Sequence, residues 1–106
     1  MLDLSPIHLN ITGSILQQWI PQYEVWAFGS RVTGTARKYS DLDLVLISDH
    51  PLDFGFLGKI RDAFSESDLP FKVDVIGWAS VSPEFREIIR KNYEVIQYGK
   101  KSPHSP

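Results

Sequence analysis

The chain has 106 residues, 42% of them hydrophobic, which suffices for one compact domain with a single core. It contains no cysteine, so disulfides and thiolate metal sites are excluded and a reducing cytoplasm is the expected compartment. The net charge is −2 with the basic residues scattered, which argues against stable nucleic-acid binding, and no apolar stretch is long enough to cross a bilayer.

The first half of the chain has the pattern of helix, strand, short helix and strand. Apolar side chains recur at helical spacing over residues 11–20, and Pro21 ends this pattern. Short apolar runs predict strands over residues 24–28 and 41–47. Between these strands, residues 30–38 are small and polar, so we expect a short irregular helix that depends on tertiary contacts.

The second half repeats the alternation. Residues 57–64 form an amphipathic helical pattern, and residues 71–76 form a strand pattern with one acid among β-branched residues. Ser82 followed by Pro83 is typical of a helix start, with serine as the N-cap and proline in the first turn. Residues 94–98 predict a short final strand.

Strands that alternate with helices predict an α/β (α+β) layer fold. The few strands available indicate a small mixed β-sheet with helices packed mainly on one face. We expect a single domain over residues 1–99, followed by a flexible C-terminal tail over residues 100–106.

Three predicted strand positions carry aspartate, a residue that is depleted in strands. Asp41 and Asp43 would share one face of their strand because alternate side chains point the same way, and Asp74 lies in another strand. Taken alone, Asp41 is more simply interpreted as capping a turn. If the two strands are neighbours, however, three carboxylates meet in one patch and repel one another unless a cation lies between them.

The donor set indicates which cation would be bound. Carboxylates without cysteine, and with the three histidines away from these strands, favour a hard, oxygen-preferring ion such as Mg²⁺. Two such ions about 4 Å apart could contact the attacking and leaving oxygens of an in-line displacement. The expected metal ligands are therefore Asp41, Asp43 and Asp74.

Gly29-Ser30 follows the first predicted strand and precedes the short helix. By itself the pair is an ordinary turn and N-cap. Together with the acids of the next strand it indicates a phosphate site, because backbone N–H groups at a helix start bind anions. Arg31, Arg37 and Lys38 cluster beside this turn.

The stretch GSRVTGTARKYSDLDL, from Gly29 to Leu44, resembles the signature of the polymerase-beta-like nucleotidyltransferases, in particular the minimal nucleotidyltransferase (MNT) branch. The resemblance continues through Val73-Asp74-Val75 and residues 85–99, so it covers nearly the whole chain. It implies the nucleotidyltransferase fold and a reaction in which a hydroxyl attacks the α-phosphorus of a nucleoside triphosphate and pyrophosphate leaves.

The resemblance also assigns roles to the residues. Asp41 and Asp43 would hold the metals, and Asp74 would bind the ion nearer the nucleophile and favour its deprotonation. Gly29 and Ser30 would bind the outgoing phosphates of ATP. Arg31 or Arg37 would screen the phosphate charge.

Stand-alone members of this branch commonly pair with a HEPN-family toxin, which implies an antitoxin that transfers AMP from ATP to a tyrosine of that partner. A small-molecule adenylyltransferase is an alternative, although it would need an acceptor-binding domain or a partner that supplies one. A non-catalytic, nucleotide-binding antitoxin module is another. A metal-dependent nuclease would also use clustered acids but would not need the Gly-Ser turn.

Overall fold

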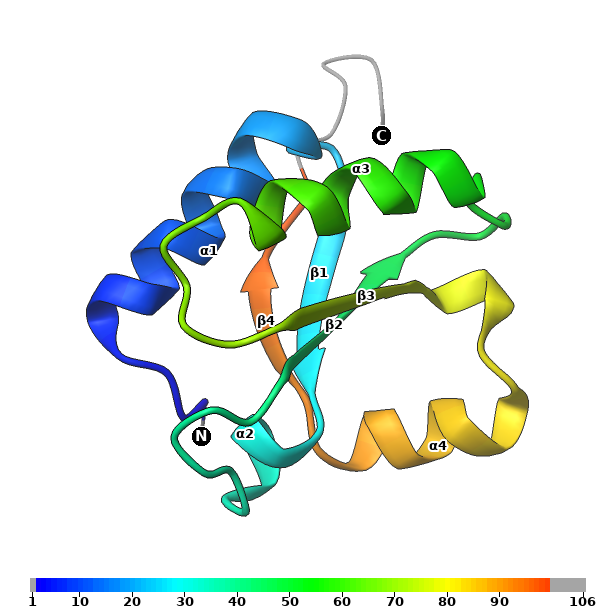
Figure 1. Cartoon of the computed structure of the whole chain (residues 1–106). Helices are drawn as coiled ribbons and strands as arrows, with labels where there is room; N and C mark the ends of the chain where they lie inside the picture. The colour runs from blue at the N-terminus through cyan, green and yellow to red at the C-terminus, as the bar shows by residue number, and fades with distance from the viewer. Residues whose placement is uncertain (1, 100–106) are drawn as a thin grey trace.

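Helices and strands alternate along residues 2–99, the part of the chain that the computed structural model describes (Figure 1). The predicted tail, residues 100–106, lies outside the described residues. Among residues 2–99, no helix has the length and apolar character that crossing a membrane requires. The elements are α1 (Pro6–Trp19), β1 (Glu24–Phe28), α2 (Ser30–Thr33), β2 (Leu42–Ile47), α3 (Phe54–Ser65), β3 (Val73–Gly77), the 3-10 turn η1 (Trp78–Ser80), α4 (Pro83–Lys91) and β4 (Glu94–Gln97).

The four strands form one mixed sheet in the order β3-β2-β1-β4. Strand β1 pairs antiparallel with both β2 and β4, whereas β2 and β3 are parallel. A parallel pair requires a long crossover connection, and α3 provides it. The predicted small mixed sheet is confirmed.

Polar caps explain where the three longer helices begin. The side chains of Ser5, Asp53 and Ser82 accept hydrogen bonds from backbone N–H groups in the first turns of α1, α3 and α4. Each cap satisfies a donor that the helix itself leaves without a partner. The helix start predicted at Ser82 is therefore confirmed.

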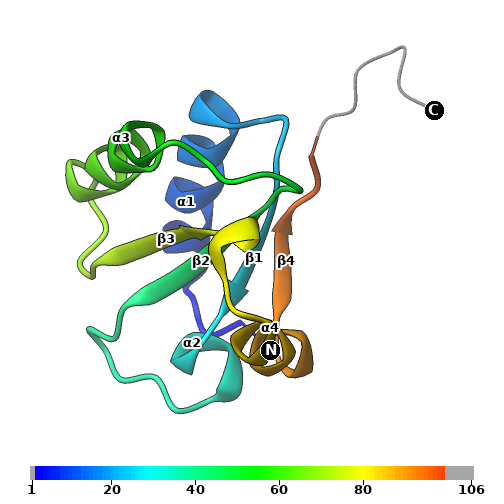
Figure 2. The ribbon, with the colours of Figure 1, turned by 90° about the vertical axis from the view of Figure 1, so that its right-hand side faces the viewer.

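The two faces of the sheet carry different helices. On one face, α1 and α3 cover the main core, whose centre includes fully buried Leu16, Val25, Leu44 and Val75. Figure 2 shows these two helices together on one side of the sheet, with α4 away from them. On the other face, Ile89 of α4 packs with Phe28 and Val45 in a second, smaller cluster.

Several boundaries differ from those predicted, and three of the differences lie near the acids. Strand β2 begins at Leu42, so Asp41 precedes the strand instead of lying within it. The helix after the Gly-Ser turn is only one turn long, because Gly34 adopts the left-handed conformation with φ +86° and ends it. Strand β3 begins at Val73, two residues later than predicted, since Phe71 packs into the main core before the strand starts.

Candidate active site

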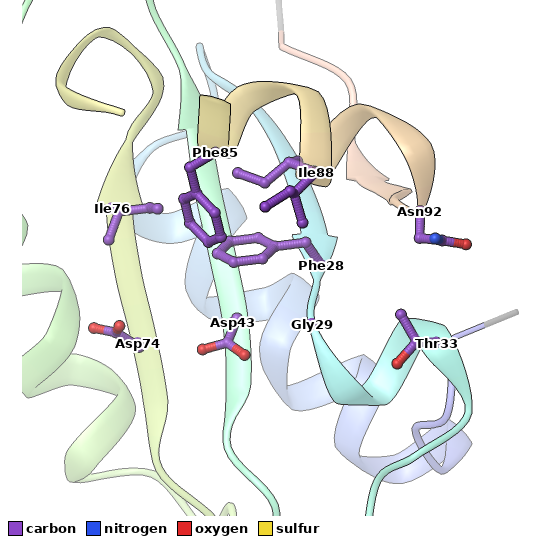
Figure 3. Close-up of a pocket in the computed structure, with 10 residues that line it drawn as sticks. Phe28, Gly29, Thr33, Asp43, Asp74, Ile76, Phe85, Ile88 and Asn92 are labelled. Carbon is purple, nitrogen blue, oxygen red and sulfur yellow. The ribbon is translucent and has the colours of Figure 1, made fainter. Parts of the chain in front are cut away.

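Asp43 and Asp74 are direct neighbours on adjacent strands. The parallel register of β2 and β3 pairs the two residues, and both side chains are half-buried. Alternation along the strands places them on the face that carries α4, because Leu42, Leu44, Val73 and Val75 belong to the core on the opposite face. Figure 3 shows the two carboxylates side by side at the edge of one cavity.

The electrostatic environment of this pair favours a bound cation. Burial raises the pKa of the Asp43 carboxyl above its ordinary value of 3.8, and the negative charges of Asp74 and Asp41 raise it further. Asp41 itself is exposed and is not part of the cavity wall, but its charge acts on Asp43. Of the three predicted acids, the structure therefore brings Asp43 and Asp74 together at the cavity wall, whereas Asp41 lies outside that wall.

Gly29 brings the backbone close to this acidic pair. Its φ of +80° and ψ of −156° belong to a region that essentially only glycine occupies. A Cβ atom at this position would collide with the carboxylate of Asp43. Ser30 begins α2, whose first backbone N–H groups have no partner within the helix. The backbone thus presents donors next to the carboxylates.

The cavity has a volume of about 380 Å³ and two chemically distinct parts. Figure 3 shows the polar part at Gly29, Asp43 and Asp74, and an apolar part beneath α4. Phe28 and Phe85 meet edge to face in the apolar part, with their ring centroids 5.8 Å apart. The lining residues are Phe28, Gly29, Thr33, Asp43, Asp74, Ile76, Phe85, Ile88, Ile89 and Asn92.

Neither predicted arginine lies on the cavity wall. Arg31 is only 5% exposed, and its guanidinium donates hydrogen bonds to three backbone carbonyls in the domain interior. Arg37 is exposed on the loop after α2, where its backbone N–H donates to the hydroxyl of Ser40. The placement of Arg31 differs from the expected phosphate contact because the loop folds around its side chain.

The sequence reasoning did not identify Arg61 as part of the site. This residue of α3 places its Nε 3.8 Å from Oδ1 of Asp74, and its Nη2 donates to the carbonyl of Val75 at 2.6 Å. Arg61 thus lies close to one of the two paired carboxylates and holds its strand. No local motif marks it, because only the crossover from α3 to β3 brings it there.

The donor chemistry fits Mg²⁺ in part. Asp43 and Asp74 supply carboxylate oxygens of the kind that Mg²⁺ prefers. Burial first, and then the neighbouring negative charges of Asp74 and Asp41, raise the pKa of Asp43, and a bound cation would offset the repulsion among these charges. Within residues 2–99, no group of three or more His, Cys, Asp or Glu side chains has an arrangement that could hold a metal ion. Mg²⁺ is commonly bound by one or two carboxylates together with substrate phosphates, so two adjacent acids suffice for this mode.

Comparison with known proteins gives the site a context. The profile of the nucleotidyltransferase domain family matches residues 10–100, which include the Gly-Ser turn and all three acids. A Haemophilus influenzae protein named "Probable protein adenylyltransferase MntA" is 56% identical over 105 residues, covering 99% of this chain and 92% of that protein.

Solved structures share the fold. A toxin–antitoxin complex containing AMP-PNP matches with a TM-score of 0.72 and 22% identity, covering 88% of this chain and 74% of the matched chain. A complex of a tri-AMPylated Shewanella oneidensis HEPN toxin with its MNT antitoxin matches with a TM-score of 0.64 and 20% identity, covering 87% and 70%. At these identities the likeness concerns the fold alone.

Proposed function

Because this chain belongs to the nucleotidyltransferase domain family, we propose that it is a Mg²⁺-dependent protein adenylyltransferase. It transfers AMP from ATP to a tyrosine hydroxyl of a HEPN-family toxin and thereby acts as an antitoxin. The observation that carries the proposal is the cavity in which Asp43 and Asp74 face the backbone at Gly29, in a chain 56% identical to the MntA protein of Haemophilus influenzae. The Shewanella oneidensis complex, whose MNT antitoxin has the same fold, supports a HEPN toxin as the partner and AMPylation of that toxin as the modification.

The polar part of the cavity suits the triphosphate. Gly29 has no side chain, so a phosphate group can approach the main chain, and Ser30 offers its backbone N–H and hydroxyl beside it. Asp43 and Asp74 would hold Mg²⁺ from the cavity wall, and Asp41 would complete the set of three carboxylate ligands from the solvent side. We propose two ions, as expected from the sequence. Bound Mg²⁺ would neutralise phosphate charge and orient the α-phosphate for in-line attack.

The position of Asp74 suits an acceptor on a separate protein. Strand β3 is one of the two edge strands of the sheet, so no further strand of the described residues lies beyond Asp74. There it would orient the acceptor hydroxyl and favour loss of its proton as the oxygen bonds to the α-phosphorus and pyrophosphate leaves. The apolar part of the cavity, with Phe85 38% and Ile88 61% exposed, offers a surface for the ring of the nucleotide or of the acceptor.

Two further expectations remain part of the proposal. Residues 1–99 form the single catalytic domain, with substrate choice supplied by the partner's surface because the domain has one sheet and no separate acceptor-binding layer among residues 2–99. ATP is an intracellular substrate, so we place the reaction in the cytoplasm.

Intact mass spectrometry tests the activity directly. We expect incubation with the HEPN-family protein encoded beside this chain, ATP and Mg²⁺ to add whole adenylyl units to that partner, since transfer retains the α-phosphate. Asp41→Ala, Asp43→Ala and Asp74→Ala should each abolish the mass gain, because each removes a carboxylate from the metal site. Asp68→Ala is the matched control, because Asp68 is exposed and does not line the cavity.

The same samples separate the alternatives when toxin activity is assayed beside the mass. A partner that is neutralised without a mass gain, and remains neutralised by all three alanine variants, would show a non-catalytic binding module. A gain on an added small hydroxyl compound, with none on the protein partner, would show a small-molecule adenylyltransferase.

A further inference from the structure

Arg31 is a buried cation that the proposed chemistry does not use. Its Nε donates to the carbonyl of Ser40 at 3.0 Å, its Nη1 to that of Asp3 at 3.0 Å and its Nη2 to that of Lys38 at 3.2 Å. The guanidinium also lies over the ring of Phe71, 4.1 Å from its centroid. Each of its three nitrogens therefore contacts a carbonyl oxygen, and one of its faces covers an aromatic ring.

These contacts join the two segments that deliver the acids. Ser40 immediately precedes Asp41, and Phe71 comes three residues before Asp74. Between the segments, the backbone N–H of Leu42 donates to the carbonyl of Lys72 at 2.9 Å, where β2 and β3 begin to run side by side. The Arg31 side chain thus lies where both segments enter the sheet.

The N-terminal segment also contacts Arg31, through two hydrogen bonds with Asp3. The backbone N–H of Asp3 donates to the carbonyl of Arg31, while Arg31 Nη1 donates to the carbonyl of Asp3. Arg31 therefore contacts three chain segments that are far apart in sequence. A charge so completely engaged with carbonyls and a ring is not available to a phosphate in the cavity.

We propose that Arg31 is a positioning residue, which fixes Asp41 relative to Asp43 and Asp74 by bracing the loop over residues 37–41 against the start of β3. The role rests on the proposed function, since it concerns the acids that would hold the metal there. It replaces the direct phosphate contact expected from the sequence.

Lysine distinguishes positioning from phosphate contact. A guanidinium is a planar fork that can serve several carbonyls and stack on a ring at once, whereas an ammonium is a point charge on a flexible stem. If Arg31 positions the loop, Arg31→Lys should impair loop protection and metal affinity as much as Arg31→Met does. If Arg31 screens phosphate charge, Arg31→Lys should retain most of the ATP affinity and Arg31→Met should not.

Two measurements without ATP turnover test the proposal. Amide hydrogen exchange followed by NMR should become at least about tenfold faster at Ser40 and Leu42 in both variants, because each loses hydrogen bonds that hold the loop. Exchange in β1 should stay unchanged. Mn²⁺ affinity of the nucleotide-free protein, measured by electron paramagnetic resonance of free Mn²⁺, should fall about tenfold in both variants.

Arg90→Met is the matched control, because Arg90 is an exposed arginine of α4 outside the cavity wall, and both readouts should match the wild type. If Arg31→Met does not fold, Phe71→Leu removes the ring beneath the guanidinium and keeps an aliphatic side chain in the main core. It must show the same pattern in weaker form, with exchange in β1 unchanged.

Uniform acceleration of exchange across the domain, unchanged Mn²⁺ affinity in the variants, or recovery of both readouts by Arg31→Lys would each overturn the proposal. So would a wild-type protein that binds no Mn²⁺. Failure of the proposed function is distinguishable, because the partner protein would then gain no adenylyl mass even while the loop and Mn²⁺ readouts follow the expected pattern.

Discussion

Gly29→Ala should be unusually costly for a single added methyl group. Two effects combine at this position. The backbone conformation, φ +80° and ψ −156°, costs a residue with a side chain about 1–3 kcal/mol. The new Cβ would also collide with the terminal oxygen of the Asp43 side chain, and turning that carboxylate away from its preferred rotamer adds about 0.5–1.5 kcal/mol. We therefore expect a loss of about 1.5–4.5 kcal/mol in the free energy of unfolding, or at least about 6 °C in Tm.

Gly34→Ala is the matched control for the backbone effect. Gly34 also has a positive φ, +86°, but a Cβ there would meet no heavy atom within 4 Å. Its replacement should cost about 1–2 kcal/mol, the price of a left-handed residue alone. Urea denaturation at equilibrium, with thermal melts as a second measure, compares the two variants.

Combining Gly29→Ala with Asp43→Ala isolates the collision. In the Asp43→Ala background only the backbone effect remains, so the cost of Gly29→Ala should fall to about 1–3 kcal/mol. An equal cost in both backgrounds would refute the collision. A cost no larger than that of Gly34→Ala would refute the reasoning altogether.

Two other variants probe the cavity. Because burial and like charge raise the folded-state pKa of Asp43 above its ordinary value of 3.8, the folded protein binds this proton more tightly than the unfolded chain does. The contribution of this carboxyl to the free energy of unfolding should therefore fall as pH rises from 3.8 through the raised pKa. Asp43→Asn should remove this decrease from a plot of the free energy of unfolding, measured by urea denaturation, against pH. An unchanged slope in the variant would contradict the raised pKa. Ile88→Ser should change the free energy of unfolding by less than about 0.5 kcal/mol, because the side chain is 61% exposed, yet raise KM for ATP or for the acceptor several-fold in a transfer assay. If neither KM for ATP nor KM for the acceptor changed, the apolar part of the cavity would not belong to the substrate site.

Much of the fold follows from local patterns. Apolar runs located all four strands within a few residues, because side chains buried on a sheet face must alternate or run continuously. Ser82 and Pro83 located the start of α4 because capping is a matter of neighbouring residues. The placement of α4 on the face opposite α1 and α3 has no such local cause, since an apolar stripe does not specify which side of the sheet it will cover.

The same distinction holds for the site. The sequence predicted that Asp43 and Asp74 would meet if their strands were neighbours, and the parallel register of β2 and β3 pairs them. It did not predict the interior position of Arg31, whose partners are carbonyls of residues 3, 38 and 40, since any residue type can supply a backbone carbonyl. Nor did it associate Arg61 with Asp74, because that proximity arises from the crossover through α3.

The parallel pairing of β2 with β3 determines how precisely the carboxylates of Asp43 and Asp74 are positioned relative to each other. The separation of Asp43 and Asp74 is governed by the distance between adjacent strands, about 4.8 Å, and by register. A slip of one residue in β3 would turn Asp74 into the apolar core and bring Val73 or Val75 to the cavity. Aliphatic residues that never touch a substrate therefore hold the two carboxylates in alignment. Substitutions beneath α1 and α3 that loosen this packing would impair catalysis without changing any group that reacts.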